Sequence, residues 1–441
     1  MMKLRYKLKI EDSLSPFRTE IEYVLSILER YYPLQRDDRS KDELPELFYG
    51  SGESSPDVNI PAVLFEKFIE IDRTTQGVSL KPGAVSELLN RRTGLLPANP
   101  SRGDNRGKID YDAIGLAFFM LSRIEERNCS NLDKYGRFPA SQAFSVRAGL
   151  HSLPLADLAL DDIAKRLLLR ESPQHNSDYL VIPTHDVDML KPYHMIHQPL
   201  RYALGDFLKR GHPVKGLKRL ASYGLNEPKN SFNRLMSLSE KYNLTSRFYF
   251  MGPSNHKMDS SYSNRYPELT KNMAEEVKSR GHIVGFHPGY MTFDDPNEWS
   301  RQKRDLEKII QMPVKEGRQH VLRYDCDQTH KIWSDEGMSV DHTLAFPDIS
   351  GFRSGSTRPY PAFDLTARGP LNNDICSTAV MEFCLFGNKY RDLTIEEALD
   401  EVKPLIVACR RYGGKFVILQ HTGNASKIVK RFYENIIEEA A

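Results

Sequence analysis

From about residue 178 to the C-terminus, short apolar runs alternate with amphipathic stretches of helical period. The stretch PELTKNMAEEVKSRG, which lies between two such runs, begins with proline, carries acidic residues early and basic residues late, and ends on glycine, as helices commonly do. Strands that alternate with helices are typical of parallel sheets. The pattern therefore predicts a distorted seven-stranded (β/α) barrel, with strands at YLVIPTH, SRFYFM, HIVGFH, RQHVLRY, DHTLAF, STAVMEF and KFVILQH.

The N-terminal part of the chain follows a different pattern. The runs LFYGSG, VNIPAVLF and IDYDAIGLAFFMLSRIEE predict a smaller mixed α/β unit, and no catalytic constellation stands out in it. The segment ESPQHNSD, residues 171–178, is polar and contains proline, as linkers often do. We therefore predict an accessory α/β domain over residues 1–170 and a (β/α) barrel over residues 178–441.

Length and composition narrow the classes of protein. A chain of 441 residues exceeds the usual size of a single hydrophobic core, and its 61 basic and 59 acidic residues nearly cancel, which argues against nucleic acid as a partner. The five scattered cysteines form no CxxC pair and predict reduced thiols rather than disulfides or a zinc ribbon. The longest apolar stretch, AIGLAFFML, is too short for an integral membrane segment, and the start lacks a secretory pattern. We expect a cytoplasmic protein.

Polar side chains gather where the predicted strands end. Asp186 and Asp188 follow the first run and lie two residues apart, so on a strand both point to the same side. Two carboxylates so close favour a bound cation or a shared proton, although a solvated turn without metal is the alternative. His287 and His421 end their own runs, and Arg353 lies in a later loop. Because the active site of a parallel barrel lies at the carboxyl ends of its strands, these residues predict a functional site.

Two other histidines are placed by the same rule. His282 comes at the start of HIVGFH, so we expect it at the opposite end of that strand. His320 comes early in RQHVLRY, and the rule leaves its position open.

These strand ends resemble motifs of the polysaccharide deacetylases with a NodB-type domain, carbohydrate esterase family 4. THDVD resembles the first motif, GHIVGFH the second and LQH the Leu-x-His motif, in the same order along residues 178–441. The resemblance implies a metal-dependent enzyme that removes N- or O-acetyl groups from sugars. It also implies that Asp186 is the general base, that Asp188 and His287 bind the metal, and that His421 is a catalytic histidine.

The similarity extends to a bacterial subgroup of these enzymes. YDAIGLAFFMLSRIEE, DKYGRFPASQAF and GFRSGSTRPYPAFD are similar to members that carry an extra N-terminal domain and are linked with surface-polysaccharide gene clusters. The resemblance implies an acetylated sugar or polysaccharide precursor as the partner. The sequence leaves open which sugar this is, whether the acetyl group is on nitrogen or oxygen, and the oligomeric state.

The second motif departs from the usual pattern. That motif normally has another histidine four residues after the first, but here Met291 stands four residues after His287, and a thioether is a poor ligand for a borderline cation. His320, in GRQHVLR, is the best replacement. We therefore expect a divalent ion, most simply zinc, held by Asp188, His287 and His320. The alternative is a site that binds metal weakly or not at all.

The resemblance also implies supporting roles. Arg318 takes the place of the family's arginine and would orient Asp186, and Asp348 would tune the catalytic histidine. Arg353 and Arg358 flank the same loop, and their chemistry makes them candidates for binding an acidic sugar or a phosphate. The alternative is a surface arginine for Arg318 and ordinary solvated loop charges for the other three residues. Two other functions remain open, a non-catalytic sugar-binding relative of the deacetylases and an amide hydrolase acting on a small molecule.

Overall fold

The structure is a computed structural model that divides into two compact units, each built from two segments of the chain. Unit 1 comprises residues 1–181 and 321–418, and unit 2 comprises residues 182–320 and 419–441. These units do not coincide with the predicted ranges 1–170 and 178–441, because residues 321–418 belong with the N-terminal residues. The structure describes residues 3–51, 56–72, 74–90, 93–97, 109–127, 129–169, 175–190, 197–208, 210–214, 216–217, 228–386, 391–423 and 426–441.

The first segment of unit 1 is the expected mixed α/β structure. Its parallel sheet has the order β2-β1-β3-β4, and the runs LFYGSG and VNIPAVLF supply β3 and β4. Helix α3, formed by AIGLAFFMLS, is buried on every side and packs against α1 and α5, which explains why it has no polar face. The elements of this segment are β1 (Leu4–Ile10), α1 (Arg18–Tyr31), β2 (Leu34–Arg36), β3 (Glu46–Tyr49), β4 (Val58–Ile60), β5 (Ile69–Ile71), β6 (Val78–Leu80), α2 (Ala84–Leu88), α3 (Ala113–Ser122), α4 (Phe144–Arg147) and α5 (Leu155–Leu168).

The second segment of unit 1 completes the hydrophobic core of the first. The sequence did not predict its antiparallel hairpin of β12 and β13, which lies against α1 and α3. The Phe363 ring on β12 lies 4.7 Å from the Tyr23 ring and 5.3 Å from the Phe118 ring, centroid to centroid. One core therefore holds both segments. The elements are α12 (Thr329–Asp335), β11 (Val340–Asp341), β12 (Tyr360–Asp364), β13 (Gly369–Ile375), β14 (Val380–Met381), α13 (Glu382–Phe386), β15 (Arg391–Asp392), α14 (Ile395–Arg411) and β16 (Lys415–Leu419).

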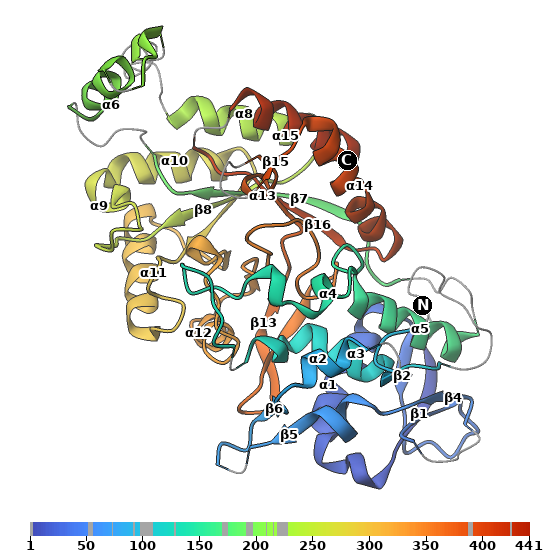
Figure 1. Ribbon diagram of the computed structural model, residues 1–441. Helices are drawn as coiled ribbons and strands as arrows, with labels where there is room; N and C mark the ends of the chain where they lie inside the picture. Colours follow the sequence, from blue (N-terminus) through green and yellow to red (C-terminus); the bar gives the residue numbers. More distant parts are fainter. Residues whose placement is uncertain are drawn as a thin grey trace. The chain divides into compact units, whose positions relative to one another are not determined.

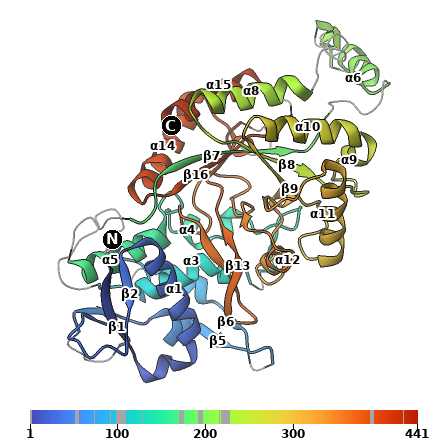
Figure 2. The ribbon, with the colours of Figure 1, turned by 180° about the vertical axis from the view of Figure 1, so that it is seen from behind.

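Unit 2 is built on a row of parallel strands in the order β10-β9-β8-β7. Strand β7 is buried along nearly its whole length, as is usual for parallel strands covered on both faces. Helices α8, α10 and α15 run along one side of β7 and β8 in both views (Figures 1 and 2). The elements are β7 (Leu180–Val187), α6 (His197–Leu208), α8 (Pro228–Lys241), β8 (Arg247–Met251), α9 (Tyr262–Arg265), α10 (Pro267–Ser279), β9 (Ile283–His287), α11 (Pro296–Ile310), β10 (Glu316–Gly317) and α15 (Lys427–Ala440).

The described residues do not form the predicted closed barrel of seven strands. In unit 2 the row is open, since β10 and β7 are not paired in its strand order. The runs DHTLAF and STAVMEF contribute only the short strands β11 and β14, and STAVMEF passes directly into α13. In RQHVLRY the strand cannot continue because Val321 and Leu322 adopt φ values of 61° and 57°, in the left-handed region.

Two expectations from composition can be compared with the structure. All five cysteines lie within the described residues and none forms a disulfide, as predicted. Among the described helices, none is both long enough and apolar enough to cross a bilayer.

Candidate metal centre

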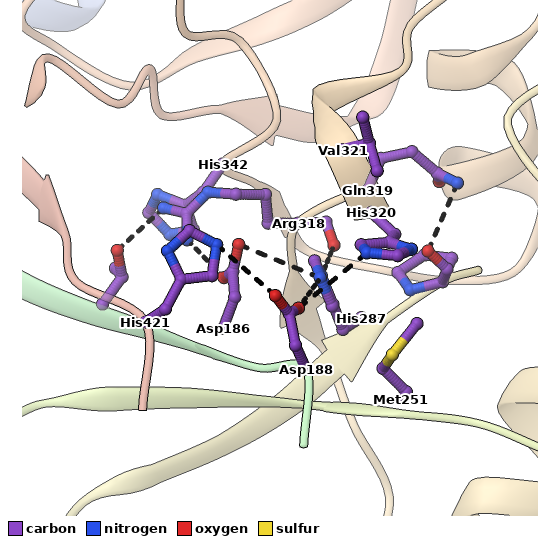
Figure 3. Close-up of polar contacts among 12 residues, drawn as sticks. Asp186, Asp188, Met251, His287, Arg318, Gln319, His320, Val321, His342 and His421 are labelled. Atoms are coloured by element: carbon purple, nitrogen blue, oxygen red, sulfur yellow. Dashed lines mark hydrogen bonds and ion pairs between the residues drawn. The ribbon is translucent and has the colours of Figure 1, made fainter. Parts of the chain in front are cut away.

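The end of β7 carries the two acids that the sequence singled out. Asp186 is buried and Asp188 is partly exposed. Figure 3 shows the two side chains beside the histidines of the site. One Asp186 oxygen accepts a hydrogen bond from Arg318 Nη1 at 2.7 Å, and Arg318 Nη2 donates to Thr184 Oγ1 at 2.8 Å. The guanidinium of Arg318 is also buried, so this is a charge-assisted pair shielded from water. The predicted contact between Arg318 and Asp186 is therefore present.

The pairing of β9 with β10 places His287. Gly317 lies opposite Phe286, and any side chain there would collide with the Phe286 carbonyl oxygen, so this close approach requires glycine. As a result the Arg318 carbonyl oxygen lies 2.6 Å from His287 Nδ1. A carbonyl oxygen can only accept a hydrogen bond, so Nδ1 carries the proton. In the neutral imidazole the lone pair is then on Nε2, which lies 3.3 Å from Asp188 Oδ1.

His320 lies next to the same carboxylate. The chain leaves β10 at Gly317, and His320 begins a short 3₁₀ turn. The backbone N–H of His320 donates to the Pro288 carbonyl oxygen at 2.9 Å. Nε2 of His320 lies 3.9 Å from Asp188 Oδ1, and the His320 and His287 rings are 5.1 Å apart, centroid to centroid. His320 is therefore beyond the carboxyl end of its strand rather than near the start of one.

The three groups have the chemistry and spacing of a cation site. One donor atom from each of Asp188, His287 and His320 lies within 4.8 Å of the other two. Asp188 Oδ1 and His287 Nε2 are buried atoms without a hydrogen-bond partner among the described residues, and both face the space between the three side chains. Buried polar atoms normally have a partner, so these two atoms fit a bound cation. Two imidazole nitrogens and one carboxylate oxygen suit zinc.

The electrostatics of the site favour ionised carboxylates. Burial raises the pKa of Asp186, whereas the Arg318 guanidinium and His287 lower it by a larger amount. The net pKa is therefore below its ordinary value. Burial likewise opposes ionisation of Asp188, whose pKa is nevertheless held well below its usual range by the neighbouring histidines. Burial lowers and the two carboxylates raise the pKa of His287, with a net rise. Both carboxylates are therefore ionised near neutral pH.

His421 approaches Asp188 from another direction. The segment after Leu419 runs beside β7, with Gln420 N donating to Thr184 O at 3.0 Å and Thr422 N donating to Asp186 O at 3.2 Å. His421 Nε2 lies 3.8 Å from Asp188 Oδ2. Figure 3 shows His421 on the side of Asp188 away from His287 and His320. The structure thus brings together all six residues predicted for the base with its arginine, the metal and the catalytic histidine, namely Asp186, Asp188, His287, Arg318, His320 and His421.

Two residues outside this group bear on the prediction. His282 precedes β9 and is buried, with its Nδ1 accepting from Ser246 N at 3.1 Å, so it lies at the end of the strand opposite His287, as expected. Met291, at the position of the usual second histidine, carries a thioether instead of an imidazole, and the residue is 48% exposed.

Three predicted residues lie in unit 1. Arg353 is buried, and its guanidinium donates to both Glu126 oxygens at 2.9 and 2.5 Å. Arg358 is also buried, donates to Asp157 at 3.2 Å and lies over the rings of Tyr31 and Tyr32.

Glu126 binds the guanidinium of Arg353, whereas Nη2 of Arg358 has no hydrogen-bond partner among the described residues. The assignment of both arginines to substrate binding stays a prediction. Asp348 is half-buried, and burial raises its pKa. Its proposed action on the catalytic histidine stays a prediction.

The sequence analysis missed Asp259. This residue lies in the loop after β8, and its Oδ1 is 2.6 Å from His320 Nδ1. Its segment, NHKMDSSYSN, has the composition of an ordinary polar loop, so no pattern marks it.

Comparisons with known proteins give a partial match. Residues 14–172 match the model of a family of unknown function (DUF7033), which is less than half of the chain. No curated protein matches the sequence significantly.

Several solved structures are remotely similar. A putative polysaccharide deacetylase from Mycobacterium smegmatis is 18% identical, with 59% of this chain and 84% of that chain covered and a TM-score of 0.37. The CE4 family pseudoenzyme BA3943 from Bacillus anthracis is 12% identical over 61% of this chain and 63% of its own, with a TM-score of 0.30. The catalytic domain of the peptidoglycan N-acetylglucosamine deacetylase from Eubacterium rectale is 15% identical over 59% and 83%, with a TM-score of 0.27. Similarity at this level assigns no activity.

Proposed function

We propose that the chain is a metal-dependent deacetylase that removes an acetyl group from a sugar of a bacterial surface polysaccharide or its precursor. The observation that carries the proposal is the position of Asp186, held by Arg318, beside the cluster of Asp188, His287 and His320. Asp186 Oδ2 lies 3.9 Å from His287 Nε2, so a base and a potential metal site share one buried space. A structural ion pair alone would not require three further donor groups at the same point.

The chain's own residues divide the chemistry. Asp188, His287 and His320 would hold a divalent ion, which when bound supplies a Lewis acid that acidifies water and polarises the acetyl carbonyl. Asp186 is the base that takes a proton from the attacking water. Its charge-assisted hydrogen bond to Arg318 keeps the carboxylate ionised and fixes its direction.

His421 acts on the leaving group. During hydrolysis a bond forms between the water oxygen and the acetyl carbon, and the bond from that carbon to the sugar nitrogen or oxygen breaks. The leaving atom must gain a proton, and His421, on the far side of Asp188 from the other histidines, is placed to donate it. The products are acetate and a free amine or hydroxyl on the sugar.

The test compares two neighbouring acids. Asp186→Asn should retain zinc and lose most acetate release from acetylated sugars, because a base contributes to rate rather than to the ligand set. Asp188→Asn should lose zinc as well as activity. Zinc content and acetate release are measured on the same samples, and equal loss of zinc in both variants would contradict the division of roles.

Two rival functions have distinct outcomes in the same assay. The zinc-loaded wild type could bind acetylated sugars without releasing acetate. That result would favour a non-catalytic sugar-binding relative, the hypothesis that Met291 supports. Acetate release from small amides but not from sugars would favour a small-molecule amide hydrolase.

A further inference from the structure

We propose that Asp259 is the positioning residue that makes His320 a metal ligand, in place of the histidine absent at position 291. This inference rests on the proposed metal site. In this proposal Asp259, a loop residue, determines which nitrogen of His320 faces Asp188 and His287.

The surroundings of Asp259 support this role. Its side chain is only 1% exposed, and three groups from three separate segments donate to it. Oδ1 accepts from His320 Nδ1 at 2.6 Å and from Tyr290 N at 2.8 Å, while Oδ2 accepts from Ser254 Oγ at 2.6 Å.

The hydrogen bonds of the Asp259 carboxylate fix the tautomer of the imidazole. Because Asp259 can only accept, Nδ1 of His320 keeps its proton and Nε2 presents its lone pair toward Asp188. A negative acceptor also makes the imidazole a stronger ligand. His287 is oriented differently, since its Nδ1 donates to the neutral carbonyl of Arg318.

The loop after β9 is shaped around this carboxylate. A side chain at Gly289 would place its Cβ 2.6 Å from Asp259 Oδ2, so glycine is needed for the loop to approach. Gly289 N donates to Gln302 Oε1 at 2.9 Å, which anchors the loop to α11. The segment that would carry the usual second histidine therefore closes on Asp259 instead and supports a ligand that comes from the end of β10.

Zinc affinity is the first measurement. Competition with a chromogenic chelator should give a dissociation constant for zinc about 10 to 100 times weaker in Asp259→Ala than in the wild type. Asp259→Asn keeps an acceptor oxygen without the charge and should lie between the two. Asp295→Ala is the matched control, because Asp295 caps α11 in the same unit and accepts only from backbone N–H groups at 3.1 and 3.0 Å. Its zinc affinity should equal that of the wild type.

The second measurement is the tautomer of His320, read from imidazole ¹⁵N shifts in the metal-free protein. A single Nδ1–H form is expected in the wild type, and a mixture of the two tautomers in Asp259→Ala. A purely structural role would not change this ratio. If Asp259→Ala does not fold, Asp259→Asn carries both measurements.

The outcomes separate this inference from the proposed function. Wild-type zinc affinity in folded Asp259→Ala, or an unchanged tautomer in both Asp259 variants, overturns the role of Asp259 and leaves the metal site standing. A wild-type chain that takes up no more zinc than Asp188→Ala overturns the metal site and this inference together.

Discussion

Two groups of buried charges in this molecule differ in whether their polar atoms are already paired. In unit 1 the guanidinium of Arg353 donates to both oxygens of Glu126 and to the Ala345 carbonyl. In unit 2 the facing atoms of Asp188 and His287 have no hydrogen-bond partner among the described residues. A buried charge that is fully paired needs no further partner, whereas converging ligand atoms without partners fit a bound cation. The difference favours a structural role for Arg353, which the sequence suggested as a binding residue, and a ligand-binding role for Asp188 and His287.

The largest expected effect concerns the core of unit 1. A chain that starts at residue 178 contains Phe363 without Tyr23 and Phe118, the rings it packs against. We expect the urea m-value of this truncated chain to be that of unit 2 alone, because residues 321–418 lose the core they share with the N-terminal residues and the m-value scales with the surface exposed on unfolding. An m-value in proportion to the full length of the fragment would show that residues 178–441 are an independent domain, as the sequence predicts.

The second prediction concerns the buried ion pair of unit 1. Arg353→Ala should lower the free energy of unfolding by about 3 to 5 kcal/mol, because it leaves a buried carboxylate without one of its partners. The control is Arg301→Ala, which removes a half-exposed pair with Glu298 and should cost less than about 1 kcal/mol. Urea denaturation of both variants is the measurement, and similar losses would contradict the distinction between buried and exposed pairs.

The third prediction concerns the polar atoms of unit 2 that have no hydrogen-bond partner among the described residues. Asp188→Ala and His287→Ala should each reduce bound zinc well below one ion per chain, because each removes a donor atom of the cluster. Zinc at 100 times its dissociation constant should stabilise the wild type by about 2.7 kcal/mol and these variants not at all. Metal analysis and thermal unfolding with and without zinc test this, and full zinc occupancy in both variants would mean that the site is misplaced.

The smallest expected effect sharpens the account of the third ligand. His320→Ala should weaken zinc binding by at least about tenfold, roughly 1.4 kcal/mol, since two donor atoms remain. Adding Met291→His to that variant should recover part of the loss by restoring the usual spacing of four residues from His287. Zinc titrations of the single and double variants give the answer. Unchanged affinity in His320→Ala would remove this residue from the ligand set.

Local patterns predicted much of unit 2. Strands β7, β8 and β9 coincide with apolar runs, and the residues at their ends, Asp186, Asp188 and His287, lie where the strand-end rule places them. The rule works because the functional residues of parallel strands lie at the carboxyl ends of those strands, at one edge of the sheet. The local sequence alone is enough to identify a strand end.

Features that depend on contacts distant in sequence were not predictable. The strand expected at RQHVLRY is broken by left-handed residues at Val321 and Leu322, whose β-forming side chains give no warning of a turn. Arg358 is paired with Asp157, about two hundred residues away, and Asp259 supports His320 from another loop. Such partners are fixed by tertiary structure rather than by periodicity.

The interleaved order of the two units has a consequence for synthesis. The chain passes from unit 1 to unit 2 after Val181, returns after His320 and leaves again after Ile418. On the ribosome the aromatic residues of α1 and α3 emerge long before Phe363, so their apolar surface stays uncovered while residues 182–320 are being made. Exposed apolar surface of this kind promotes aggregation and recruits chaperones. We therefore expect nascent chains arrested near residue 320 to associate with chaperones more strongly than chains arrested after residue 418.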